Sequence, residues 1–404
     1  MTISEFEQHA VKEAVTHRPT PAGGESVGPA DVHRRAIIVD GHCDTPYRLR
    51  RVGLQIEDAD PDAQVDLRTL RHSGVTASFF ASYVPPFYAG RGSARFADDL
   101  IDIIQSTAAR HPNEFMLGTT SAHIREAKEK GLIALMIGIE GGHAIEDSLD
   151  TLRRFYARGV RYLTLTHVNT NNWCDSSGDT ARHGGLTDFG REVVRTMNDL
   201  GMIVDISHVS DAAFYHALET TRVPIIASHS SCRALTNHPR NMTDQMLRDL
   251  GTNDGICMIN FFSAFINQGV ATVMMKAQKR PGHRDLPGPN EELPNDRTDW
   301  ALYLEWFRAL GCPEATIEDL VDHIAHAASV AGIDHVGIGS DFDGVPSLPS
   351  DLKDASFLPA LTDRLSRRGF SNDDIEKILG KNFLRVFEAI ESGSSPLPAE
   401  EGAV

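Results

Sequence analysis

Short apolar runs that end abruptly in polar residues recur along the chain, and amphipathic stretches separate them. The runs are rich in Ile and Val, which is typical of buried parallel strands. They are Ala36–Val39, Val75–Val84, Leu132–Ile139, Tyr162–Thr166, Met202–Ile206, Pro224–Ala227, Gly255–Ile259 and Val336–Ile338. Helical periodicity lies between many of them, for example over Leu149–Ala157, Phe189–Leu200, Asp211–Leu218 and Ile317–Ala331.

Eight strands that alternate with helices predict a (β/α)₈ barrel of the TIM type, with an open doubly wound sheet as the alternative. Residues 263–315, which contain a stretch dense in Pro, Gly and charge, form a long excursion between the seventh and eighth predicted strands. Such an excursion is either a functional lid or a disordered segment. We therefore expect an N-terminal helix and loop over 1–34, one barrel domain over 35–392 and a tail over 393–404.

Several helix boundaries are marked by residues that cap helices. Thr187 and Ser210 each stand immediately before a predicted helix, where a hydroxyl accepts a hydrogen bond from the first turn. The segment Leu352–Ser392 predicts two or three helices, and Ser371 stands at the start of one of them.

Composition and charge exclude some classes of protein. The formal net charge of −17 argues against binding to the nucleic-acid backbone, which requires clustered Lys and Arg. The five cysteines lie far apart and form no CxxC pair, which suits a reducing compartment. Neither a signal peptide, nor a membrane span, nor a lipid-anchor signal is recognisable. We therefore expect a soluble, cytoplasmic protein with no membrane partner.

Acidic and imidazole side chains follow most of the predicted strands. The carboxyl ends of parallel strands in a barrel converge on one face, so these side chains should share one pocket. Crowded carboxylates are costly unless a cation neutralises them, and imidazole with carboxylate suits Zn²⁺, with Fe²⁺, Mn²⁺ or Co²⁺ as alternatives. The residues are His42, Asp44, Glu140, His167, His208, His229 and Asp341.

Each of these residues taken alone also has a structural interpretation. His208 and His229 fit as core histidines, Glu140 as a buried ion-pair partner, and Asp341 as a carboxylate that caps a turn. The recurrence of the pattern at five separate predicted strand ends favours a metal site. Among the other candidates, His143 fits a supporting position near the ligands, His323 and His326 fit structural positions on a helix, and Cys43 fits packing.

Five blocks of the sequence together resemble the membrane dipeptidase (renal dipeptidase) family of metallopeptidases. They are VDGHCDTP, GIEGGHAIEDSLDTLRRFYARGVRYLTLTH, GLTDFGREVVRTMNDLGMIVDISHVSDAAF, SHSSCRAL followed by HPRNM, and HVGIGSDFDGV. The resemblance runs from about Ala36 to Ala389 and implies a (β/α)₈ barrel with two Zn²⁺ ions. It implies that one ion is held by His42, Asp44 and Asp341, that the other is held by His208 and His229, and that Glu140 bridges them.

The same resemblance implies two substrate-binding residues and a homodimer. His167 matches the family's histidine near the scissile carbonyl, and Arg240 matches the arginine that holds the substrate's C-terminal carboxylate. Asn169 stands where a disulfide cysteine of the secreted mammalian members is expected, which favours a microbial, intracellular version. The excursion over 263–315 differs from the compact mammalian pattern and leaves the substrate range open.

These residues suggest a mechanism for dipeptide hydrolysis. A hydroxide shared by two metals attacks the peptide carbonyl, while His167 donates a hydrogen bond to the oxyanion. Asp341 passes the water's proton to the leaving amine, and Arg240 fixes the carboxylate. His167 could instead be a packed histidine at a strand end, and Arg240 a plain surface arginine.

Two other functions are less favoured by the sequence. Other binuclear-metal amide, lactam or lactone hydrolases on this barrel often combine His-x-His on the first strand with a modified lysine on the fourth, whereas this chain has His42-x-Asp44 and His167 there. A non-catalytic scaffold would have lost ligands, and all six are present. The side chains of the dipeptide, tolerance of a D-residue at its C-terminal position, β-lactam cleavage and the native metal stay open.

Overall fold

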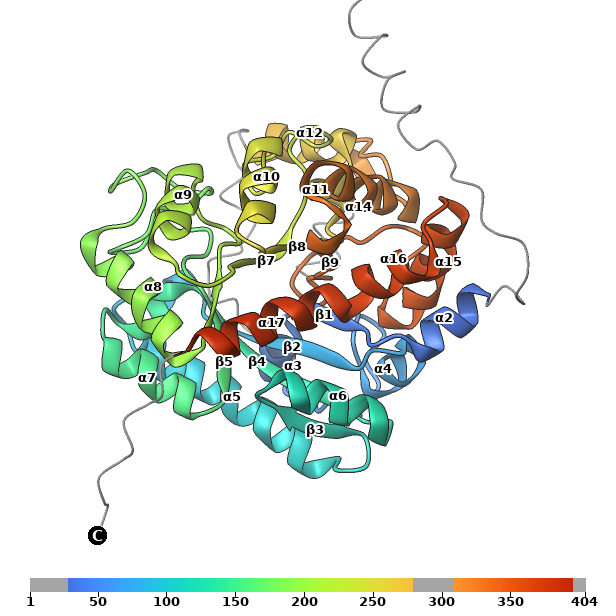
Figure 1. Ribbon diagram of the computed structural model, residues 1–404, viewed down its shortest axis with the longest axis horizontal. Coiled ribbons are helices and arrows are strands. Elements are labelled where there is room, and N and C mark those ends of the chain that lie inside the picture. Colours follow the sequence, from blue (N-terminus) through green and yellow to red (C-terminus); the bar gives the residue numbers. More distant parts are fainter. Residues whose placement is uncertain (1–27, 279–307, 395–404) are drawn as a thin grey trace, which may run out of the picture.

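Eight parallel strands form a closed barrel in the computed structural model, which describes residues 28–278 and 308–394 (Figure 1). The helix expected near the N-terminus, the middle of the 263–315 excursion and most of the expected tail lie outside the described residues. The barrel strands are β1 (Val39–Cys43), β2 (Ala77–Tyr83), β4 (Ile133–Glu140), β5 (Val160–Thr164), β6 (Ile203–Asp205), β7 (Ile226–Ser230), β8 (Ile256–Ile259) and β9 (Val336–Ile338).

The pairing of the strands closes the sheet on itself. The strands follow the order β2-β1-β9-β8-β7-β6-β5-β4, and β2 pairs with β4 along its whole length, from Ala77 opposite Ala134 to Tyr83 opposite Glu140. The predicted (β/α)₈ barrel is thereby confirmed, and the open doubly wound sheet is wrong. Each of the eight predicted apolar runs coincides with one barrel strand.

A ninth strand was not predicted. This strand, β3 (Phe115–Gly118), pairs with the first half of β4, while β5 pairs with the second half of the same edge. The β3 sequence FMLG is only four residues long and half of its side chains are partly exposed. It therefore lacks the long, fully buried Ile- and Val-rich character by which the barrel strands were recognised.

Helices surround the barrel, and the predicted helix boundaries agree with the structure. Side-chain oxygens of Thr187, Ser210 and Ser371 each accept the expected capping hydrogen bond from the first turn. The helices that follow the first six barrel strands are α3 (Thr45–Val52), α5 (Ser93–Arg110), α7 (Leu149–Ala157), α8 (Asp188–Leu200), α9 (Asp211–Thr220) and α10 (Asp244–Thr252). The others are α2 (Pro29–Arg35), α4 (Leu67–Ser73), α6 (Ser121–Lys130), α11 (Ser263–Ile266), α12 (Gln268–Gln278), α14 (Ile317–Ala331), α15 (Leu358–Arg367), α16 (Asn372–Glu376) and α17 (Asn382–Gly393). None of the described helices combines the length and apolar composition that crossing a membrane requires.

Within its described residues, the excursion between β8 and β9 is partly helical. It begins with α11 and α12, whose residues Phe265 and Val270 pack with Phe262 and with Val345 from the loop after β9. This apolar cluster fixes the start of the excursion at the carboxyl end of the barrel. The sequence pattern did not reveal it because the cluster combines residues from two distant segments.

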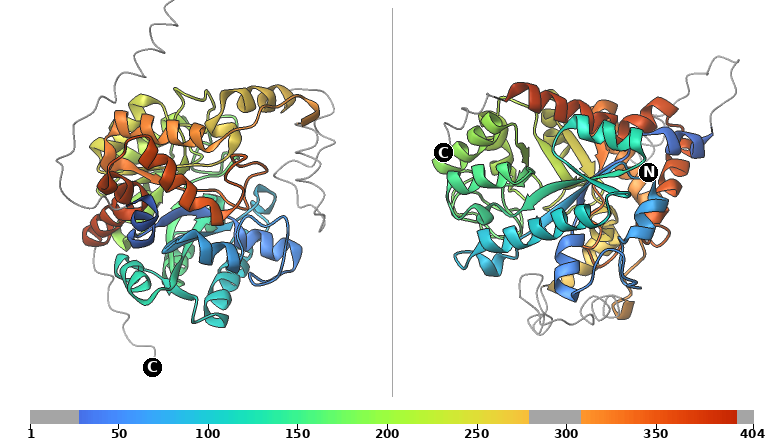
Figure 2. Two further views of the ribbon diagram at one scale, coloured as in Figure 1. Left: turned by 90° about the vertical axis from the view of Figure 1, so that its right-hand side faces the viewer. Right: turned by 90° about the horizontal axis from the view of Figure 1, so that it is seen from below.

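Apolar side chains fill the inside of the barrel and its amino end. Phe383 and Phe387 of α17 join Phe79 and Tyr162 in one buried cluster, and the rings of Phe79 and Phe383 lie 5.4 Å apart. The short segment before α17 contacts the backbone just before β1, at the amino end of the strands. The last helix, red in Figures 1 and 2, thus crosses the amino end of the barrel. The carboxyl end remains available for a site.

Candidate metal centre

The carboxyl ends of the strands bring the six predicted ligands together. His42 lies on β1, His229 lies on β7, and Glu140 is the last residue of β4. Asp44, His208 and Asp341 occupy the loops that follow β1, β6 and β9. All six side chains are buried. The apolar runs predicted that these residues follow the strands, but three of them, His42, Glu140 and His229, lie inside strands.

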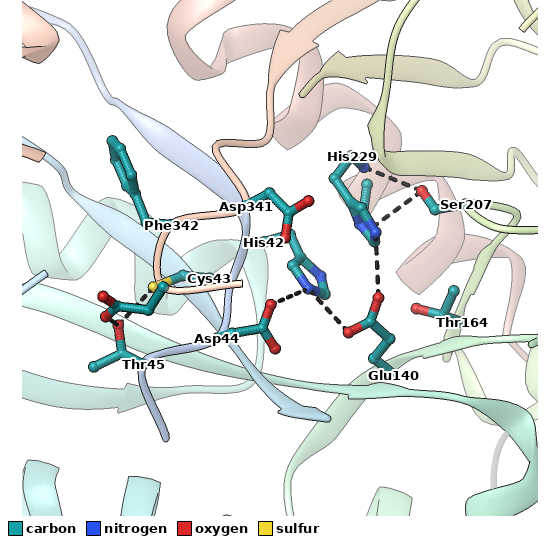
Figure 3. Close-up of polar contacts among 12 residues, drawn as sticks. His42, Cys43, Asp44, Thr45, Glu140, Thr164, Ser207, His229, Asp341 and Phe342 are labelled. Atoms are coloured by element: carbon teal, nitrogen blue, oxygen red, sulfur yellow. Dashed lines mark hydrogen bonds and ion pairs between the residues drawn. The ribbon is translucent and has the colours of Figure 1, made fainter. Parts of the chain in front are cut away.

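Glu140 lies at the centre of this group, and its two oxygens face different partners. Oε2 is 3.4 Å from His42 Nε2, whereas Oε1 is 2.9 Å from His208 Nε2 and 3.3 Å from His229 Nε2. Figure 3 shows His42 and His229 turned toward this carboxylate from two sides. The two oxygens of Glu140 are therefore directed at different histidines of the group.

The donor atoms form groups compact enough to hold a metal ion. Ligand atoms of His42, Asp44 and Asp341 lie within 4.8 Å of one another, and Glu140 forms similar groups with His42 and His229 and with His167 and His208. The Nε2 atoms of His208 and His229 are only 3.0 Å apart. Converging imidazole nitrogens and carboxylate oxygens are the donor set that Zn²⁺ and related transition metals prefer.

The electrostatics of the group also fit a cation. Burial raises the pKa of Asp44 to about 8, because it outweighs the charge and hydrogen bond of His42, which lower the pKa, and the charges of Glu140 and Asp341 raise it too. Oδ1 of Asp44 is buried without a hydrogen-bond partner among the described residues. A bound cation would stabilise this carboxylate in its ionised form and give the orphaned oxygen a partner.

Two of the imidazoles are held by hydrogen bonds at their second nitrogen. His42 Nδ1 lies 2.7 Å from the Tyr162 hydroxyl, and His229 Nδ1 lies 2.7 Å from the Ser228 hydroxyl. Ser228 in turn donates to the Asp205 carboxylate at 2.7 Å. These contacts leave Nε2 of both histidines for a metal, which is the usual arrangement behind a ligating histidine. Tyr162, Ser228 and Asp205 were missed from the sequence because they look like ordinary strand residues.

Asp341 is held in place by its neighbours. It adopts a left-handed backbone conformation with φ 63°, which is uncommon for residues other than Gly. The Asn260 side-chain amide donates to its Oδ2 at 2.7 Å. Asn260 directly follows β8. The search for polar residues at strand ends that found the candidate ligands could therefore have found this residue too. Asp343, two residues on, accepts from Thr45 at 2.6 Å and from the Gln64 backbone at 2.9 Å, which anchors the loop.

The two predicted substrate-binding residues lie beside the cluster. His167 Nε2 is 3.8 Å from Glu140 Oε1, and burial lowers the pKa of His167 to about 4, so the ring is neutral at pH 7. Arg240 is 7% exposed, so the plain surface arginine considered from the sequence is wrong. Its guanidinium donates to the His229 carbonyl at 3.0 Å and to the Ser230 hydroxyl at 3.2 Å, and it makes no ion pair within the described part of the chain. A buried cation of this kind suits an anionic ligand.

The remaining candidates have other surroundings. His323 contacts the Cys232 backbone amide and the Ile266 carbonyl through its two nitrogens, and His326 contacts Asp244 at 2.8 Å. His323 therefore joins α14 to the segment after β7 and to the end of α11, and His326 joins α14 to the start of α10. The Cys43 thiol lies 2.9 Å from the Thr45 hydroxyl, and burial raises its pKa well above the ordinary value, which suits packing and not nucleophilic attack.

A closed parallel barrel with histidine and carboxylate donors gathered at its carboxyl end is the architecture of a metal-dependent hydrolase. The family model for membrane dipeptidase, peptidase family M19, matches residues 29–401. The chain therefore belongs to the membrane dipeptidase family and is a dipeptidase of the metallopeptidase class.

Individual relatives agree with this assignment. Dipeptidase verJ of Clonostachys rogersoniana is 35% identical over 373 residues, which cover 88% of this chain and 85% of that protein. An uncharacterized dipeptidase of Schizosaccharomyces pombe is 34% identical, with 89% and 82% covered. The crystal structure of the probable dipeptidase PvdM from Pseudomonas aeruginosa superposes with a TM-score of 0.78 at 26% identity and covers 91% of this chain and 98% of that one.

Proposed function

We propose that the enzyme hydrolyses dipeptides at a centre of two Zn²⁺ ions. His42, Asp44 and Asp341 would hold one ion, His208 and His229 the other, and Glu140 would bridge them. The observation that carries this proposal is the orientation of Glu140, whose two oxygens face separate histidines. Two such ions lower the pKa of a bound water and polarise a carbonyl oxygen. Other divalent transition metals fit the same donors.

Arg240 would bind the C-terminal carboxylate of the dipeptide. Its buried guanidinium has no anionic partner among the described residues, and its Nε is buried without a hydrogen bond. A carboxylate placed there would accept two parallel hydrogen bonds and neutralise the buried charge. Arg240 would thereby select small substrates that carry a free carboxylate near the scissile bond.

His167 and Asp341 would manage charge and protons at the reacting carbonyl. Neutral His167 would donate a hydrogen bond to the oxygen that becomes negative in the transition state. Asp341 would accept a proton from the attacking water and return it to the leaving amine. The Asn260 amide that contacts Asp341 Oδ2 leaves the other carboxylate oxygen for this task.

The decisive test is a dipeptide panel with L,L and L,D members, run on protein of defined metal content. We expect release of free amino acids, loss of turnover on removal of the metal, and two zinc ions per chain by elemental analysis. Turnover that survives complete metal removal would contradict the proposal. Inclusion of lactones and β-lactams in the panel decides between the dipeptidase and the other amide, lactam or lactone hydrolases.

Replacement of Arg240 tests the carboxylate clamp. Arg240→Ala should raise KM for dipeptides roughly a hundredfold, because a buried charge-assisted pair is lost. Arg248→Ala is the matched control, since this arginine is exposed on α10 and its guanidinium contacts Gln245 of the same helix at 3.3 Å. An unchanged KM in Arg240→Ala would count against the clamp.

The homodimer and the cytoplasmic location expected from the sequence remain proposals. Light scattering on the purified enzyme distinguishes a dimer of about twice the 44.3 kDa chain mass from a monomer. Fractionation of the source cells tests the location.

A further inference from the structure

A cavity of about 590 Å³ opens among the loops beside the metal centre. The loop after β2, the 3₁₀ turn Gly142–Ile145 with the residues beyond it, and the loop after β5 contribute its walls. Its lining includes Pro86, Gly90, His143, Glu146, Asp147 and Asn169. The candidate ligands, His167 and Arg240 are not among its lining residues, but His143 follows Glu140 by three residues and Asn169 follows His167 by two, so the loops that line the cavity continue the segments that carry Glu140 and His167. A volume of several hundred cubic ångströms is that of a ligand pocket.

The order of the strands places the loop after β2, which lines this cavity, across the barrel from the loop that carries Arg240. Arg240 lies in the loop after β7, and β7 is separated from β2 by three strands in either direction around the closed sheet. A dipeptide that binds Arg240 through its carboxylate and presents its carbonyl to Glu140 and His167 therefore directs its N-terminal residue toward β2, β4 and β5. The cavity lies at the carboxyl ends of those three strands.

Two carboxylates give the cavity a negative character. Glu146 accepts a hydrogen bond from the Ala94 backbone at 3.2 Å, and Asp147 accepts one from Asn172 at 2.7 Å. Neither carboxylate forms an ion pair with a described residue. Arg182 also lines the cavity, but its guanidinium donates to the Thr170 carbonyl at 2.8 Å and lies 3.8 Å from Asp179. The two acids therefore have no ion-pair partner among the described residues that line the cavity.

An unpartnered buried side chain also points to a ligand at this place. His143 is 7% exposed and lines the cavity, yet neither ring nitrogen has a hydrogen bond that meets normal geometry. Burial lowers its pKa to about 4, with the carbonyls of Pro85 and Val84 opposing the shift only in part, so the ring is neutral at pH 7. A buried polar group of this kind requires a partner, which a bound ligand or water can supply.

The backbone that carries the acids is held in an unusual conformation. Glu146 and Asp147 are consecutive and both left-handed, with φ 51° and 53°. Residues other than Gly adopt this region at some cost, and such residues concentrate at ligand-binding sites. This left-handed turn places both carboxylates in the lining of the cavity.

We propose that this cavity receives the side chain of the N-terminal residue of the dipeptide, and that Glu146 and Asp147 make it select basic over acidic side chains. The inference rests on the proposed dipeptidase function and adds the substrate class. The cavity is larger than an α-ammonium group requires, and its negative charge complements a lysine or arginine side chain.

The test compares dipeptides that differ only in the N-terminal residue. The wild-type enzyme should show a higher kcat/KM for Lys-Ala than for Leu-Ala, and the lowest for Glu-Ala. In the double variant Glu146→Gln with Asp147→Asn, the ratio of Lys-Ala to Glu-Ala should fall by up to roughly tenfold, as expected for two exposed charge pairs. Both substitutions keep the oxygen that accepts the observed hydrogen bond. The control is Asp150→Asn, which removes a charge from a side chain that is 93% exposed on α7.

The outcomes separate this inference from the function on which it rests. An unchanged Lys-Ala to Glu-Ala ratio in the double variant, or an equal change in the Asp150→Asn control, overturns it. An equal loss for all three dipeptides overturns it as well, because it would assign the carboxylates to the α-ammonium group. Absence of any dipeptide turnover by metal-loaded wild-type enzyme would instead be a failure of the proposed function. In a second series of dipeptides that differ only in the C-terminal residue, the double variant should show the same charge preference as the wild type.

Discussion

The four histidines around Glu140 fall into two pairs that differ in how they are held. His42 and His229 each have a hydroxyl 2.7 Å from Nδ1, whereas Nδ1 of His167 and of His208 is buried without a hydrogen-bond partner. The first pair has its ring orientation and tautomer fixed by the protein alone. The second pair depends on the backbone, and His208 has φ 71°, in the left-handed region.

The protein itself thus orients the rings of His42 and His229, whereas no hydrogen bond at Nδ1 orients the rings of His167 and His208. Tyr162 and the Ser228–Asp205 chain hold two nitrogens ready on the β1 and β7 side before any ion arrives. On the β5 and β6 side, Nδ1 of His167 and Nδ1 of His208 have no such hydroxyl to hold the ring. We therefore expect substitutions at the two sides to affect different measurements.

Glu140 joins the two sides, and its loss should have the largest effect. Glu140→Gln removes the charge that both sides share, so kcat/KM should fall about a thousandfold or more, consistent with the several kcal/mol that metal ions contribute. Metal content should fall below two per chain by elemental analysis. Glu114→Gln, an acid paired with Arg71 far from the site, is the control. Full metal content with normal turnover would contradict the proposed role of Glu140 as the carboxylate that both sides share.

His167 should matter for turnover and not for metal. His167→Asn should lower kcat about a hundredfold, as expected for loss of one hydrogen bond to the oxyanion. Steady-state kinetics measures this, and elemental analysis should find the metal content of the wild type. Reduced metal content in this variant would make His167 a ligand and erase its distinction from His42.

Ser228 should matter for metal affinity on the fixed side. Ser228→Ala removes the hydroxyl that orients His229, so the weaker of the two metal dissociation constants should rise roughly ten- to a hundredfold in competition with a chromophoric chelator. Tyr162→Phe should act in the same way through His42. Ser82→Ala is the matched control, because that buried hydroxyl donates to the Ala97 carbonyl and no ligand. Equal affinities in Ser228→Ala and the control would contradict the role.

A histidine outside the site should give the smallest effect. Burial lowers the pKa of His323 to about 3, against 6.5 in an unfolded chain. Between those values the unfolded state binds the extra proton, so the free energy of unfolding should decrease as pH falls below 6.5, by up to about 1.4 kcal/mol per pH unit. Urea titrations of metal-free wild type and His323→Asn should show a shallower slope for the variant. Identical slopes would exclude this contribution.

The sequence predicted the parts of the molecule that follow a local rule. Barrel strands are buried on both faces and read as continuous apolar runs, so all eight were found. The candidate ligands follow from the convergence of strand ends, which also brings Glu140 and His42 together. The family resemblance added the division between two metals, the bridging role and Arg240, none of which strand positions alone could supply.

The groups that support the ligands could not be predicted in this way. Tyr162 reaches His42 from another strand because Gly138 leaves room for its ring inside the barrel, where a Cβ would come within 2.1 Å of it. Ser228 and Asp205 act through contacts between β6 and β7. These relations depend on three-dimensional packing between distant segments, which no periodicity along the chain encodes. The cavity beside His143 was missed for the same reason.

The helix across the amino end of the barrel has a consequence for synthesis of the chain. Phe383 and Phe387 of α17 complete the cluster that contains Phe79 and Tyr162, so the barrel interior stays incomplete until residues 382–393 have left the ribosome. Until then, the strands that have already been synthesised expose the apolar side chains that α17 later covers, and such exposed surface favours association with chaperones. Tyr162 belongs to that same interior and also contacts His42. We therefore expect the candidate metal centre to be fully packed only after α17 has been synthesised.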